Sequence, residues 1–168
     1  LLDLTEAANA QGLSITAQVA PRPIGVLLGL QGSLNPFTAC PGYRAIAALP
    51  LAERLALLQQ PALRQQLLAE LQDLGLQRDR KRDPLLPRFD AFDRVYAFGD
   101  PPDYEPPADQ SVAAIAARLG VSPAEAAYDL LLGDAGRAFL FAPFANYAEG
   151  NLDACHDMLA HRHCVPGL

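Results

Sequence analysis

The stretch that decides the fold class begins with Phe139-Leu-Phe-Ala-Pro-Phe144 and runs to Cys164-Val-Pro-Gly-Leu168. The first run predicts a buried strand, and the loop Asn146-Tyr-Ala-Glu-Gly150 follows it. A helix is expected from about 152 to 161, and the apolar run at 164 predicts a second strand. Strand, helix and strand in succession indicate a parallel β/α architecture.

The beginning of the chain predicts another helix and strand. Apolar residues recur at helical spacing between Leu1 and Gln11, with Gly12 after them as a cap. The residues Leu13 to Val19 alternate and are rich in β-branched side chains, which predicts a strand. Pro21-Arg-Pro23 ends this strand because proline cannot donate to a sheet. Residues 24–42 contain many Gly and Pro, and we expect loops there.

The middle of the chain predicts a set of helices. One begins at about Leu51, and Pro61 starts a second that reaches about Leu74. An exposed connector is expected over 77–88, a short strand over 94–98 and an extended, proline-rich loop over 99–107. Two capped helices then follow, over 112–119 and from Pro123 to about Gly133. We expect this hairpin to pack through four apolar side chains, Ile115, Leu119, Ala126 and Leu130.

Composition indicates a globular domain and excludes several classes of partner. The 168 residues are 51% hydrophobic and 19% charged, with a formal net charge of -6. An acidic chain does not suit nucleic acid, and the helix expected at 124–131 offers no base-reading Arg, Lys, Asn or Gln. No apolar run approaches the roughly 18 residues of a membrane helix. Three widely spaced Cys indicate reduced thiols in a cytoplasmic protein.

Three residues are candidates for substrate binding. Arg22 lies just past the first expected strand, between two prolines, where its guanidinium is placed to hold a carboxylate. The alternative is a structural Arg that bonds loop carbonyls. Asn146 and Tyr147 occupy the equivalent position after the strand that begins at Phe139, and can line a pocket. Their alternative role is a turn that leads into the next helix.

All three His and two of the three Cys gather between Cys155 and Cys164. Imidazole and thiolate are common zinc ligands, but neither a Cys-x2-Cys nor a His-x3-His pair is present. His161 and His163 lie between an expected helix end and a strand start, so their rings need not converge. We therefore expect no metal site in this cluster.

Taken together, several segments resemble the N-acyl-D-amino-acid deacylase (D-aminoacylase) branch of the metal-dependent amidohydrolase superfamily. The resemblance covers nearly the whole chain and rests on a long pattern rather than one diagnostic motif. The segments that carry it are 18–37 (Gln-Val-Ala-Pro-Arg-Pro-Ile-Gly and onward), 43–47, 51–54, 111–120, 141–153 (Phe-Ala-Pro-Phe-Ala-Asn-Tyr and onward) and 165–168.

The resemblance implies an α/β fold, namely the late part of a TIM (β/α)8 barrel with an inserted helical lid, incomplete in this chain. Residues 1–37 would be a barrel helix and strand with a rim loop. Residues 38–110 would be the lid and a proline-rich connector, and 111–168 a helical hairpin and the last barrel β/α units. The expected chain is an internal piece of a larger enzyme, whose catalytic Ser-Asp-Gly-Gly motif would follow residue 168.

The implied function is amide hydrolysis of N-acyl (D-)amino acids or related linear amides by zinc-activated water. The family's zinc ligands and catalytic Asp would lie outside this chain, so catalytic and metal residues are expected to be absent from it. The chain would contribute Arg22, Asn146 and Tyr147 to substrate binding, with the rest of its own barrel as partner. The residues also allow a second hypothesis, an α-helical protein-interaction module without catalysis.

Overall fold

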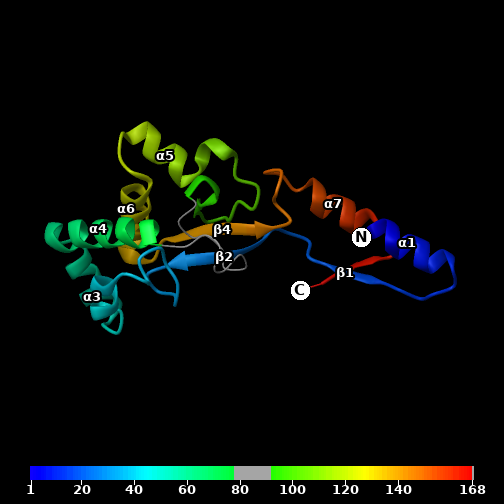
Figure 1. Ribbon diagram of the computed structural model, residues 1–168, viewed down its shortest axis with the longest axis horizontal. Helices are drawn as coiled ribbons and strands as arrows, with labels where there is room; N and C mark the ends of the chain where they lie inside the picture. The colour runs from blue at the N-terminus through cyan, green and yellow to red at the C-terminus, as the bar shows by residue number, and fades with distance from the viewer. Residues whose placement is uncertain (78–91, 168) are drawn as a thin grey trace. The chain divides into compact units, whose positions relative to one another are not determined.

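The computed structural model of this protein describes residues 1–77 and 92–167 and is mixed α/β (Figure 1). The described residues form seven α-helices and short strands, and these strands make no closed barrel. The helices are α1 (Leu2–Ala10), α2 (Pro41–Ile46), α3 (Leu51–Leu58), α4 (Pro61–Gln77), α5 (Val112–Leu119), α6 (Pro123–Gly136) and α7 (Asp153–Ala160). The strands are β1 (Ala17–Val19), β2 (Ile24–Gly29), β3 (Tyr96–Phe98), β4 (Phe139–Ala145) and β5 (Cys164–Pro166).

The chain divides into two compact units. Unit 1 comprises Leu1–Gly25 and Pro143–Leu168, and unit 2 comprises Val26–Ala142. Both boundaries fall inside strands, β2 and β4. The expected segments 1–37, 38–110 and 111–168 describe parts of a larger enzyme, and this division stays a prediction. The expected connector at 77–88 lies almost entirely outside the described residues.

Unit 1 contains a parallel pair of strands, whose partners the sequence did not predict. Strands β1 and β5 are parallel, with Ala17 opposite Cys164 and Val19 opposite Pro166. The helix α7 directly precedes β5, as expected. The first strand is shorter than the predicted Leu13 to Val19. The reason is local, because the Asn9 side chain accepts from the N–H of Ile15 at 3.2 Å and donates to its carbonyl at 2.8 Å.

Unit 2 contains a three-stranded sheet in the order β2-β4-β3. Here β3 and β4 are antiparallel, with Tyr96 opposite Phe141. The prediction of loops over 24–42 was wrong for 24–29, which form β2, and for the last two residues, where α2 begins. Residues 30–40 are turns and irregular backbone, as predicted. The prediction of loops rested on the many glycines of this region. A Cβ on Gly29 would lie 2.5 Å from two ring carbons of Phe139, so this glycine permits a close approach within the sheet.

Four helices of unit 2 begin where the sequence predicted, namely α3 to α6, whereas α2 was not predicted. Ser122 and Glu125 form a capping box at the start of α6, and the Ser111 side chain caps α5. The expected packing of the hairpin was partly wrong, because Leu119 is 67% exposed. Val112 and Ala116 are the side chains of α5 that are buried, one turn apart on the same face.

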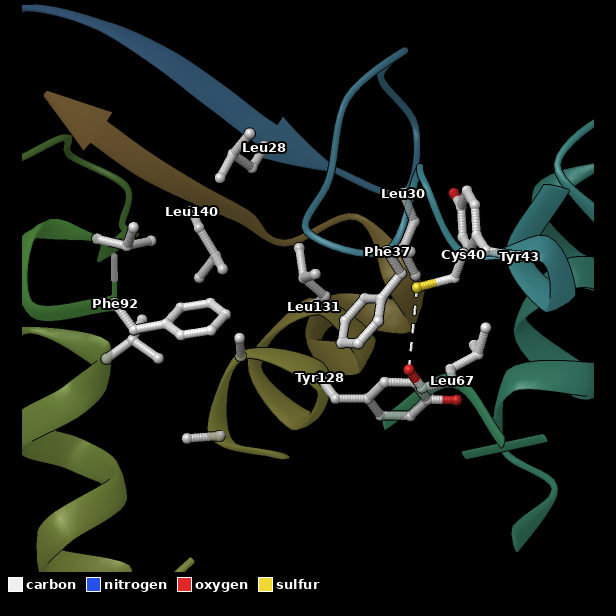
Figure 2. Packing of buried hydrophobic residues seen from close by; sticks show 14 of the residues in the cluster. Leu28, Leu30, Phe37, Cys40, Tyr43, Leu67, Phe92, Tyr128, Leu131 and Leu140 are labelled. Carbon is white, nitrogen blue, oxygen red and sulfur yellow. Dashed lines mark hydrogen bonds between the residues drawn. The ribbon is translucent and has the colours of Figure 1, made fainter. Parts of the chain in front are cut away.

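The core of unit 2 lies between the sheet and these helices. Figure 2 shows Phe37 and Tyr128 at its centre, with Leu30 and Leu131 beside them. The rings of Phe37 and Tyr128 meet edge to face, with centroids 5.2 Å apart. Cys40 is fully buried at the margin of this core, and its Sγ donates to the Leu67 carbonyl at 3.9 Å.

Candidate functional site

Arg22 lies in unit 1, three residues after β1 ends, in the exposed turn that leads into β2. One guanidinium nitrogen, Nη1, donates to the carbonyl of Pro23 at 3.4 Å. This is a long hydrogen bond, and the residue has at least one further interaction in the structure. An exposed guanidinium at this place is chemically able to hold a carboxylate. The bond to Pro23 is the kind of contact that the structural alternative proposed.

Asn146 directly follows β4 and adopts a left-handed backbone conformation, with φ at +59°. Asparagine tolerates this conformation better than most residues, so Asn146 suits a sharp reversal of the chain. Its carbonyl accepts from the buried Cys155 Sγ on α7, at 3.8 Å. Asn146 therefore joins the end of β4 to α7, which fits the turn that the sequence left open as its alternative role.

Tyr147 is buried, with 5% of its surface exposed. Its carbonyl accepts from the N–H of Gly150 at 3.4 Å, which closes a turn before α7. A residue so enclosed presents little surface to a ligand. Arg22, Asn146 and Tyr147 all belong to the same compact unit. Their role in substrate binding stays a prediction.

The His-rich segment before β5 contacts α1, which the sequence did not predict. The carboxylate of Glu6 on α1 forms an ion pair with Arg162, whose Nε donates at 3.1 Å. Its Oε2 also lies 3.7 Å from Nε2 of His161 and 3.5 Å from Nε2 of His163. The two imidazole rings are neighbours, with centroids 5.8 Å apart. The hydrogen bond from Arg162 holds the pKa of the Glu6 carboxyl below its ordinary value, and both imidazoles act in the same direction.

This cluster is not arranged as a zinc site. Among residues 1–77 and 92–167, no group of three or more His, Cys, Asp or Glu side chains could hold a metal ion. A further detail agrees with this. Nδ1 of His161 accepts from the N–H of His163 at 3.3 Å, so the neutral ring carries its proton on Nε2, toward Glu6. A metal on Nε2 would need that proton on Nδ1, opposite a second donor.

Sequence reasoning missed Glu6, and only a weak signal for it existed. Glu6 is an acidic side chain on a predicted helix, and 161–163 is a short segment able to carry positive charge. Their separation of 156 residues leaves no spacing rule to connect them. The tertiary pairing of β1 with β5 brings them together.

Comparison with protein-family models, with curated proteins and with solved structures found no match to this chain. None of the helices in the described part of the chain combines the length and apolarity needed to cross a membrane. The three cysteines are free thiols, as the sequence predicted.

Proposed function

We propose that this chain is part of a metal-dependent amide hydrolase that acts on N-acyl (D-)amino acids or related linear amides. Its contribution would be a substrate-binding wall rather than the catalytic groups. The observation that carries the proposal is the placement of Arg22, an exposed guanidinium just past the carboxyl end of a strand in a parallel pair. Functional side chains of β/α enzymes lie at such strand ends.

The chemistry of the substrate supports a role for this arginine. An N-acyl amino acid carries a free carboxylate, and a guanidinium binds a carboxylate through two parallel hydrogen bonds. Arg22 is held between Pro21 and Pro23, whose rings restrict the backbone on both sides. A restricted backbone reduces the conformational freedom that is lost when the carboxylate binds.

The described residues do not fit the zinc ion that the proposed chemistry needs, because they contain no group able to hold it. The ligands would come from the rest of the barrel, outside this chain. When bound, zinc would supply the activated water. The parallel β1–β5 pair, with α7 leading into β5, is compatible with a piece of such a barrel.

The test is a substitution in the complete enzyme that contains this chain. We expect Arg22→Lys to lower kcat/KM for N-acyl amino acids roughly ten- to a hundredfold, since the change keeps the charge but loses the paired hydrogen bonds. The loss should be much smaller for substrates whose carboxylate is replaced by an amide.

Arg44→Lys is the matched control for this test. Arg44 is another exposed arginine, and its guanidinium donates to a loop carbonyl, that of Thr38 at 3.3 Å. The Arg44→Lys substitution should leave kcat/KM unchanged. Equal losses on acid and amide substrates would make Arg22 a structural residue. A complete enzyme that hydrolyses no N-acyl amino acid in the presence of zinc would refute the proposed function itself.

The alternative, an α-helical interaction module, receives less support. The helices that would form its binding surface, α3, α4, α5 and α6, pack on one another. Their apolar faces thereby contribute to the core of unit 2. Leu119 and Val121 at the turn between α5 and α6 are exposed, but two side chains make a small surface for a partner.

A further inference from the structure

The contact between Glu6 and the segment 161–163 joins α1 to the three residues that precede β5. Three consecutive side chains, His161, Arg162 and His163, meet one carboxylate. These three supply all the charged and titratable contacts of Glu6 in the described part of the chain, and neither β1 nor α7 adds another. One acidic group thus lies against three consecutive residues. Among them Arg162 is the one that donates a hydrogen bond to it, while Nε2 of His163 is a buried nitrogen that makes no hydrogen bond to the described residues.

The strand that follows is short and contacts β1 and α7. The pair β1–β5 is three residues long, and backbone hydrogen bonds mark its two ends. The N–H of Ala17 donates to the His163 carbonyl at 2.9 Å, and the N–H of Gly167 donates to the Val19 carbonyl at 2.8 Å. A pair this short is marginal by itself, and a slip of one residue would turn every side chain of β5 to the opposite face.

We propose that the Glu6 carboxylate is a charge-dependent latch that sets the register of β5 on β1, and that neutralising it releases β5 while α7 stays folded. The three contacted side chains directly precede Cys164, the first residue of β5. Any slip of β5 would carry them away from Glu6. Only the observed register keeps both Nε2 atoms and the guanidinium beside the same carboxylate.

Amide hydrogen exchange of the 168-residue chain, measured by NMR, tests this latch. The reporting amides are those of Ala17 and Gly167, and the reference is the N–H of His156, which bonds to the Leu152 carbonyl at 2.9 Å where α7 begins. Glu6→Gln keeps the shape of the side chain and removes its charge. At pH 7 we expect protection at Ala17 and Gly167 to fall roughly three- to tenfold, the scale of a partly exposed ion-pair network.

The matched control is Asp3→Asn, which removes an acidic charge one turn earlier on the same helix. It should leave the protection of Ala17 and Gly167 unchanged, and His156 should be unchanged in both variants. Unaltered protection at Ala17 and Gly167 in Glu6→Gln would overturn the latch. An equal loss at His156 would also overturn it, because Glu6 would then stabilise unit 1 in general.

Acid provides a second, independent measurement. A carboxyl whose pKa is lowered by folding stabilises the folded state above its ordinary value of 4.5, and this contribution is lost as the pH falls through the lowered value. Protection at Ala17 and Gly167, corrected for intrinsic exchange, should therefore fall in acid more steeply in the wild-type chain than in Glu6→Gln. Identical acid profiles would contradict the proposal.

Discussion

Tyr128→Phe should destabilise unit 2 by removing a single buried hydrogen bond. The hydroxyl of Tyr128 donates to the carbonyl of Leu58 at 2.6 Å, and 2% of Tyr128 is exposed. This carbonyl belongs to the last turn of α3, where no later residue of the helix can donate to it. Phenylalanine keeps the edge-to-face contact with Phe37 and the position of the ring beneath the Arg64 guanidinium, 5.7 Å away. The change thus isolates the hydroxyl.

The expected cost is about 1–3 kcal/mol, since the substitution leaves a buried carbonyl without its donor. Guanidinium unfolding followed by circular dichroism should show a lower midpoint with an unchanged slope. Tyr43→Phe is the comparison, because the hydroxyl of Tyr43 accepts from Nη1 of the partly exposed Arg54 and removing it leaves no buried backbone carbonyl without a donor. It should cost less than about 1 kcal/mol. If Tyr128→Phe were as stable as the wild type, the buried pairing would be wrong.

Three further changes follow from the packing and backbone of unit 2. Gly29→Ala would place a Cβ 2.5 Å from the Phe139 ring and should lower the free energy of unfolding by about 1–3 kcal/mol. In a double-mutant cycle with Phe139→Ala, the two changes in this free energy should be strongly non-additive. Additive changes would refute the contact. Ala135 has φ at +52°, so Ala135→Gly should be stabilising by up to about 1 kcal/mol, and a clear loss of stability would contradict the left-handed backbone. Burial raises the pKa of Tyr128 to about 12 and that of Cys40 to about 11, from ordinary values of 10.0 and 9.0. The unfolded chain loses these two protons at a lower pH than the folded chain. The contribution of Tyr128 and Cys40 to the free energy of unfolding should therefore be constant below about pH 9 and fall up to about pH 12, and Tyr128→Phe should flatten the upper part of that fall.

The helices of this protein were largely predictable because their signals are local. Ser122 and Glu125, three residues apart, satisfy each other's backbone groups at the start of α6 without any distant partner. Pro61 begins α4 for a similar reason. The order of strand, helix and strand at the end of the chain was also visible. Their pairing was not, because β4 is antiparallel to β3 and the parallel partner of β5 is β1.

The candidate site was only partly visible in the sequence. The position of Arg22 after a strand could be predicted, because prolines end the strand on a local rule. The burial of Tyr147 could not, since it depends on the tertiary packing around this residue. The left-handed backbone of Asn146 lies between these cases, because asparagine permits that conformation without requiring it.

By itself, the sequence determined where α3 to α6 start and which segments are apolar. Only the tertiary structure decided that residues 24–29 form a strand, since Gly29 is required there by the ring of Phe139, which lies 110 residues away. It alone also placed Glu6 beside His161, Arg162 and His163. Contacts within a helix join residues at a fixed spacing, so the sequence shows them as a periodic pattern, whereas contacts made by packing follow no such pattern. The two residues of a packing contact need only meet in space, so their separation in the sequence can take any value.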